Sequence, residues 1–146
     1  MSEAPADPRE RLAALGLTLP EVPAPVAAYV PAVRTGDHVY TSGQLPFVDG
    51  KLPRTGKVGA EVGVDEARDL ARICALNALA AAAAAAGDLS RIVRIVKVVG
   101  YVASAPGFTA QPQVVNGASE LLGEVFGDAG RHARSAVGVA VLPLDA

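Results

Sequence analysis

The sequence has few of the residues that cross-link chains, stack on bases or bind soft metals. Its 146 residues contain one cysteine, Cys74, no tryptophan, three tyrosines and three phenylalanines. A single cysteine excludes a disulfide within the chain, and without a CxxC pair we expect no metal site built on thiolates. The scarcity of aromatic side chains leaves few platforms for nucleobases, which disfavours a dedicated binder of single-stranded nucleic acid.

The chain also lacks a surplus of positive charge. Lysine and arginine number 13 against 15 aspartates and glutamates, which gives a formal net charge of −2. No part of the sequence gathers lysines and arginines into a basic cluster. Because nucleic-acid binders neutralise phosphates with such clusters, we expect no nucleic acid among the partners of this protein.

No apolar run reaches the length of a membrane span. The longest, Ala78–Ala86, has nine residues, whereas a transmembrane helix needs about 20. The N-terminal stretch, residues 1–11, is polar and acidic and lacks the basic-then-apolar order of a signal peptide. We therefore predict a cytoplasmic protein without a membrane partner.

Apolar residues are nevertheless abundant, at 51% of the sequence, and the mean hydropathy is +0.32. Alanine and valine account for most of this excess, and part of it indicates surface that another subunit covers. The length suits one domain. We divide the chain into an N-terminal tail with a short helix, residues 1–15, and a single domain, residues 16–146.

The order of predicted elements indicates an α+β fold. Turn residues at Thr35-Gly36-Asp37 predict a hairpin, and β-branched runs predict two later strands. Asp65 is the expected N-cap of the first long helix, and Gly87 its stop. The predicted strands are Tyr29–Val33, His38–Ser42, Ile92–Val102 and Ala133–Leu142, and the predicted helices are Arg9–Leu15, Asp65–Ala86 and Pro112–Phe126. This order predicts a mixed sheet with two helices packed on one face.

Three segments of the sequence carry a family resemblance. They are Val39-Tyr40-Thr41-Ser42-Gly43-Gln44-Leu45-Pro46, the stretch from Asn77 through Gly87-Asp88-Leu89, and His132-Ala133-Arg134-Ser135-Ala136-Val137-Gly138-Val139 followed by Leu142-Pro143. In order and spacing they resemble the Rid family, the reactive intermediate deaminases, also called YjgF-like proteins. The third segment is similar to a YjgF-like subgroup of that family.

The resemblance implies a chorismate-mutase-like (YjgF-like) fold and a homotrimer with small-molecule sites in the clefts between subunits. It also implies an activity, the hydrolysis of reactive enamine and imine acids such as 2-aminoacrylate to a 2-keto acid and ammonia. Family members of this type use neither a metal nor an organic cofactor, so we expect no cofactor here.

Arg134 is the first candidate for a functional residue, because the matching family arginine holds the substrate carboxylate. A guanidinium offers two parallel donors that fit a carboxylate. The alternative for Arg134 is a salt bridge at the surface or an interface. The resemblance further assigns Tyr29, Ser42, Gly43, Asn116 and Ala136 to the substrate-binding cleft. As isolated residues they are also compatible with a packed tyrosine, a bend after a strand and a solvated helix asparagine.

The sequence departs from the family pattern at two places. Family deaminases often carry a cysteine two residues after the arginine, where this chain has Ala136. They also use a glutamate on a strand beyond the Leu-Pro pair, and no carboxylate in the matched segments takes its place. Imine hydrolysis needs a group that accepts or relays a proton from water, so these departures leave catalysis open.

The remaining candidates have structural alternatives. His38 and His132 have no acidic or cysteine cluster beside them, so we predict no metal site, and His132 is a candidate for the edge of the cleft. Cys74 and Phe108 are expected in the core, Phe108 with the alternative of walling the cleft. Ala67, Leu70, Ala71, Cys74 and Ala78 form the expected apolar stripe of the first long helix.

Three functions follow from these expectations. The first is deamination of enamine or imine acids, with Arg134 as the anchor. The second is binding of a small carboxylate metabolite without turnover, which the two departures favour. The third is the ribonuclease activity of some family members, against which the acidic balance of the chain argues.

Overall fold

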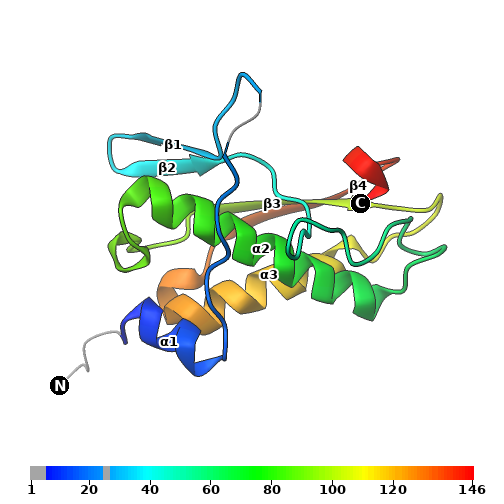
Figure 1. Ribbon diagram of the computed structural model, residues 1–146. Coiled ribbons are helices and arrows are strands. Elements are labelled where there is room, and N and C mark those ends of the chain that lie inside the picture. The colour runs from blue at the N-terminus through cyan, green and yellow to red at the C-terminus, as the bar shows by residue number, and fades with distance from the viewer. Residues whose placement is uncertain (1–5, 25–26) are drawn as a thin grey trace.

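Two long helices lie side by side along one side of the strands (Figure 1). They are α2, Val64–Ala86, and α3, Gln111–Phe126. The computed structural model describes residues 6–24 and 27–146. A short helix, α1, covers Pro8–Ala14, and the strands are β1, Ala32–Thr35, β2, His38–Thr41, β3, Lys97–Ala103, and β4, Ala133–Val139. Single 3-10 turns occupy Leu89–Arg91, Gly127–Gly130 and Pro143–Asp145.

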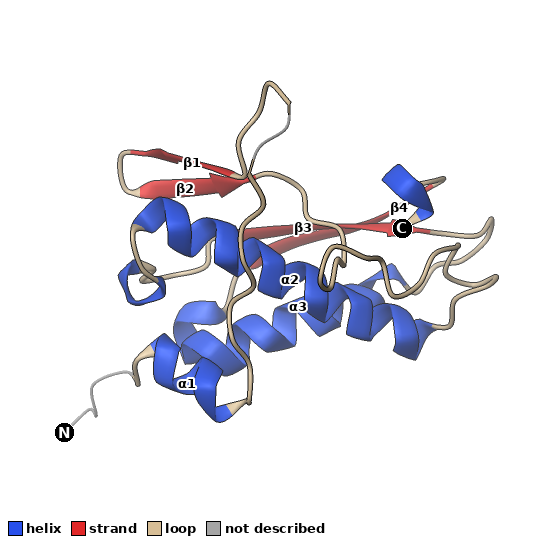
Figure 2. Ribbon diagram, viewed as in Figure 1, coloured by secondary structure: helices blue, strands red, loops and turns tan. Residues whose placement is uncertain are grey.

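The strands pair in both directions, as the prediction of a mixed α+β fold requires (Figure 2). β1 and β2 form the predicted antiparallel hairpin, with Ala32 opposite Thr41 and Thr35 opposite His38. β3 and β4 are parallel, and α3 forms the crossover between them. In the described part of the chain, these four strands form two separate two-stranded sheets, so the predicted sheet is divided.

All four predicted strands include residues outside the observed ladders, because a strand extends only as far as its partner. Ile92–Val96 precedes β3 and has no ladder, since the 3-10 turn Gly127–Gly130 delays the start of β4. There the amide of Ile95 donates instead to the carbonyl of Ala129 at 2.9 Å. β4 stops at Val139 opposite Ala103, the last residue of β3. Tyr29 likewise lies before β1, whose first pair is Ala32 with Thr41.

The N-cap of α2 lies two residues earlier than the acidic residues of the helix suggest. This N-cap is Gly63. The predicted N-cap, Asp65, lies in the first turn, where its negative charge interacts favourably with the positive end of the helix dipole. The residues of α2 that reach the core are Ala67, Ala75, Leu79, Ala80, Ala81 and Ala83. Of the predicted stripe, Ala67 is buried and Ala71 packs against the core, while Leu70, Cys74 and Ala78 are only partly buried.

The two long helices approach each other closely at Gly117. A Cβ atom added to this residue would lie 1.9 Å from the carbonyl oxygen of Arg68. Arg68 and Arg72 of α2 also form ion pairs across the contact with Glu120 and Glu124 of α3. Arg68 therefore helps to join the helices.

The core consists of two apolar clusters. The larger joins α1, α2 and α3 around Leu121 and Val125, both fully buried. The smaller joins the start of α2 and α3 to β3 and to the loop at Val58–Val62. The apolar residues Val115, Leu122 and Phe126 of α3 are buried in these clusters. Because α3 belongs to both clusters, its face toward β4 is fixed.

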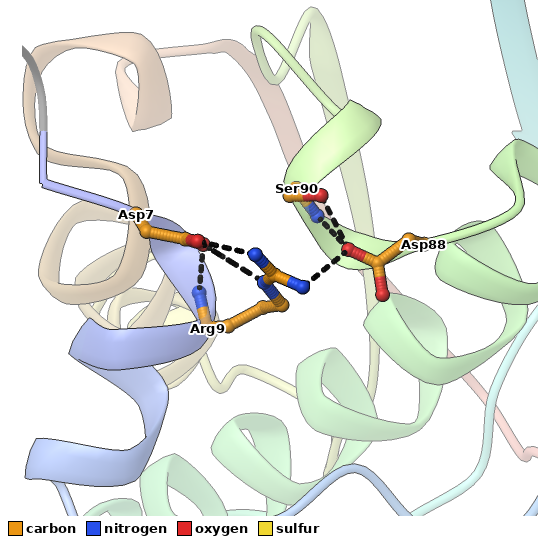
Figure 3. Close-up of polar contacts among 4 residues, drawn as sticks. All are labelled: Asp7, Arg9, Asp88 and Ser90. Carbon is orange, nitrogen blue, oxygen red and sulfur yellow. Dashed lines mark hydrogen bonds and ion pairs between the residues drawn. The ribbon is translucent and has the colours of Figure 1, made fainter.

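α1 is attached to the rest of the molecule by apolar and polar contacts. Leu12 is 5% exposed and belongs to the larger cluster. The carboxylate of Asp7 accepts from the backbone amide of Arg9 at 2.9 Å and so caps the helix. Arg9 also lies 3.6 Å from Asp88, whose carboxylate accepts from the amide of Ser90 at 2.9 Å (Figure 3). This network links α1 to the segment that follows α2.

α2 has the length and composition of a membrane span, with 23 residues from Val64 to Ala86. The sequence prediction that no apolar run is long enough did not allow for the apolar residues that precede Ala78 in the same helix. In this fold, α2 packs along α3 and contributes Ala75, Leu79 and Ala83 to the larger cluster.

Candidate functional site

Arg134 lies on β4 and points to α3. It stands opposite Val98 in the parallel ladder, near the start of the strand. Its Nη1 donates to Oδ1 of Asn116 at 2.7 Å and to Oγ of Ser119 at 3.2 Å. The structure thus brings together two of the residues that the sequence singled out, Arg134 and Asn116.

His132 and Ser119 complete this polar group. Oγ of Ser119 lies 2.9 Å from Nε2 of His132, and Nδ1 of His132 lies 2.6 Å from the carbonyl oxygen of Gly130. Ser119 was not predicted. Its position three residues after Asn116 places both side chains on one face of a helix, and this spacing was the available signal. The side that faces Arg134, however, depends on how α3 packs against β4.

These side chains line a shallow, open depression with a volume of about 370 Å3. Its lining residues are Asn116, Ser119, Gly123, Gly130, Arg131, His132 and Arg134. Two arginines and no aspartate or glutamate are among these described lining residues, so the depression favours an anion. Gly123 leaves open space, because a Cβ atom added there would meet nothing within 4 Å.

The other predicted cleft residues form a second group beside the hairpin. Tyr29 precedes β1 and its side chain is 65% exposed. Ser42 follows β2, and its Oγ donates to the carbonyl of Val30 at 2.6 Å, which holds it beside Tyr29. Gly43 has open space around it and no left-handed φ. Within the described residues, no hydrogen bond connects this group to Arg134.

Ala136 lies outside the depression. It shares the helix-facing side of β4 with Arg134, because side chains two residues apart on a strand point the same way. There it is partly buried against the smaller apolar cluster. A cysteine at this position would meet that cluster. The structure therefore places Ala136 beside the anchor, and not among the residues that line the depression.

The remaining candidate residues, Phe108, His38 and Cys74, have surroundings that fit a structural role. Phe108 packs against Gly59 and the smaller cluster, which is the core alternative. His38 is exposed at the start of β2. Burial raises the pKa of the Cys74 thiol to about 12. Across residues 6–24 and 27–146, no three histidine, cysteine, aspartate or glutamate side chains gather as a metal-ligand set.

Comparison with models of known protein families identifies the family of this chain. Residues 9–146 match the family model described as "YjgF/chorismate mutase-like, putative endoribonuclease". The chain belongs to the YjgF/chorismate mutase-like family. This agrees with the resemblance drawn from the three sequence segments, and it supports the α+β fold class.

Several known proteins are similar to this chain. Protein TCP17 from Trypanosoma cruzi is 48% identical over 133 residues, which cover 90% of this chain and 83% of that protein. The crystal structure of Atu1372 from Agrobacterium tumefaciens, a protein of unknown function, is 48% identical with a TM-score of 0.86 and covers 96% of this chain and 85% of that one. A "putative endoribonuclease" from Shewanella oneidensis is 41% identical with a TM-score of 0.89 and covers 94% and 91% of the two chains.

Two of the YjgF-like segments are in contact in the structure. Nδ2 of Asn77, at the middle of α2, donates to the carbonyl of Leu45 at 3.0 Å and to that of Phe47 at 3.1 Å. These carbonyls lie in the loop that follows Ser42-Gly43. Asn77 therefore fixes the end of the first segment against the second, which gives this asparagine a structural function.

Proposed function

We propose that this protein hydrolyses reactive enamine or imine acids of the 2-aminoacrylate type to 2-keto acids and ammonia, without a cofactor. The observation that carries the proposal is Arg134, oriented by Asn116 and Ser119 in an open depression without carboxylates. Membership of the YjgF-like family and the resemblance to its deaminases support the same activity.

The guanidinium of Arg134 is suited to anchor the substrate carboxylate. Its two hydrogen bonds to α3 both come from Nη1. Among the described residues, no hydrogen bond engages Nη2 or Nε, which share the opposite edge of the group. Two parallel N–H donors on one edge match the two oxygens of a carboxylate. Asn116 thus holds the arginine by one edge and leaves the other for the ligand.

We further propose that the complete cleft forms between copies of the chain, as a homotrimer. Tyr29 and Ser42 form a group of their own within one chain, so a neighbouring copy would bring them to Arg134. The outer face of the β3–β4 sheet supports association, because Val99, Tyr101 and Val137 are 46%, 59% and 43% exposed. Apolar residues gathered on one sheet face are typical of a surface that another subunit covers.

The decisive measurement is ammonia release from 2-aminoacrylate generated in situ. We expect the wild type to exceed the spontaneous rate and Arg134→Ala to lose about 10²-fold or more of that acceleration, because a charge-assisted bidentate contact stabilises by several kcal/mol. Arg91→Ala, which removes an exposed arginine from the 3-10 turn after α2, is the matched control and should keep full activity.

Two other outcomes would replace this proposal. Saturable binding of pyruvate without any acceleration of ammonia release would make the protein a carboxylate-binding module. Cleavage of RNA would support the endoribonuclease named in the family description. The net charge of −2 argues against RNA as a substrate, since RNA binding depends on neutralising phosphates.

A further inference from the structure

We propose that Ser119 and His132 form a proton relay that serves the hydrolysis of the imine in the depression. This inference rests on the proposed deaminase function and supplies what the sequence lacked, a group to accept the proton of the attacking water. The relay uses two side chains, one on α3 and one on the residue directly before β4, that meet only in the folded chain.

The direction of the relay follows from the partners of the imidazole. A backbone carbonyl only accepts hydrogen bonds, so Nδ1 of His132, 2.6 Å from the oxygen of Gly130, carries a proton. In the neutral ring, Nε2 then has the lone pair and accepts from Oγ of Ser119 at 2.9 Å. The carbonyl of Gly130 thus fixes the tautomer in which His132 is a base toward Ser119.

Ser119 connects this base to the substrate anchor. Its Oγ accepts from Nη1 of Arg134 at 3.2 Å while its own proton points to His132. Both Ser119 and His132 line the depression, where a water molecule has access to the hydroxyl. A 2-imino acid has its reactive carbon directly bonded to the carboxylate carbon. A carboxylate on the Nε–Nη2 edge of Arg134 therefore holds that carbon in the depression that Ser119 also lines, with the attacking water between the carbon and the hydroxyl.

The proposed steps balance without an oxidant or a metal. Water attacks the carbon of the protonated imine, a C–O bond forms, and the π electrons of the C=N bond move to nitrogen. The water proton passes to Oγ of Ser119 as the serine proton passes to Nε2 of His132. The imidazolium then returns this proton through Ser119 to the amino group. Cleavage of the C–N bond releases ammonia, which takes the hydroxyl proton as the keto group forms, so one imine cation and one water give one keto acid and one ammonium ion.

The test compares turnover with ligand binding in single and double variants. We expect His132→Ala and Ser119→Ala each to lower kcat for ammonia release by about 10²-fold or more, the range of general acid–base catalysis. The Kd for pyruvate, measured by calorimetry, should stay at the wild-type value, because Arg134 and Asn116 remain. The double variant should be no slower than either single variant, since both remove the same relay.

Chemical rescue separates a relay from a structural support. Added imidazole should restore turnover to His132→Ala, because the depression is open and the substitution leaves room for the ring. His38→Ala, which removes the exposed histidine of the hairpin, is the matched control and should behave as wild type. Circular dichroism melting confirms that each variant is folded, and the near-isosteric Ser119→Ala tests the relay if His132→Ala fails to fold.

Each contrary result has a distinct meaning. Wild-type turnover in both His132→Ala and Ser119→Ala, with Arg134→Ala inactive, would overturn the relay and leave the deaminase in place. Parallel loss of turnover and pyruvate binding without rescue would also overturn it, because His132 would then only support Arg134. No acceleration by the wild-type protein would overturn the proposed function, and the relay with it.

Discussion

Arg134 is positioned by neutral side chains, which preserves its charge for a ligand. Asn116 and Ser119 accept hydrogen bonds from Nη1 without neutralising the guanidinium. A carboxylate partner would have held the arginine as firmly and would have competed with an incoming anion. The alternative drawn from the sequence, a salt bridge, is not formed by Arg134 within the described residues.

Cys74 is a second residue whose surroundings decide its chemistry. Burial raises the pKa of its thiol from 9.0 to about 12. Since the thiolate is the nucleophile, alkylation by iodoacetamide at pH 8 should be roughly a thousandfold slower in the native protein than in guanidinium chloride. Mass spectrometry of the quenched reaction measures both rates. Equal rates would show that the thiol is exposed in the native state.

The same raised pKa links Cys74 to stability at alkaline pH. A thiol that resists ionisation in the fold stabilises it fully below about pH 9 and loses this contribution as the pH rises through about 12. The free energy of unfolding should therefore fall more steeply in the wild type than in Cys74→Ala over this interval. Urea unfolding at several pH values gives the comparison.

At the scale of elements, the contact between α2 and α3 depends on one glycine. Because a Cβ atom at position 117 would lie 1.9 Å from the carbonyl oxygen of Arg68, Gly117→Ala must force the helices apart. We expect a loss of about 1–3 kcal/mol in the free energy of unfolding, measured by urea denaturation.

Gly123→Ala is the matched control in the same helix. Nothing lies within 4 Å of the added Cβ atom, and alanine reduces the entropy of the unfolded chain. This variant should be more stable than the wild type by about 0.4–1 kcal/mol. If both alanine variants were stabilised, the close approach at Gly117 would not exist in solution.

The elements also show what the sequence could and could not predict. α3 was predicted almost to the residue, because Pro112, its apolar stripe and Gly127 all mark the same helix. The β-branched residues of Ile92–Val96 predict a strand, yet strand formation needs a partner that sequence pattern does not reveal. The sequence did not predict the contacts of Ser119 with His132 and Arg134 for the same reason, since they depend on which strand α3 packs against.

At the scale of the molecule, the exposed apolar face of β3–β4 makes the oligomer testable. Sedimentation equilibrium of the wild type should give three times the 14.8 kDa mass of one chain. Val137→Asp places a charge on that face and should yield monomers, with loss of ammonia release because Tyr29 and Ser42 no longer reach Arg134. Val93→Asp, at a residue 84% exposed and outside both sheets, should remain trimeric. A monomeric wild type would contradict the shared cleft.

The parallel pairing of β3 with β4 determines on which side of the sheet the arginine of the site lies. Asn116, Ser119, His132 and Arg134 are all encoded within one short block, on the crossover helix and the strand that it leads into. Alternate residues of a strand face opposite sides, so the register of β4 against β3, with Arg134 opposite Val98, decides where Arg134 points. A slip of one residue in this pairing would carry the arginine to the outer face of the sheet and would also remove Ala136 from the smaller apolar cluster. The apolar packing that fixes this strand therefore also guards the chemistry of the depression.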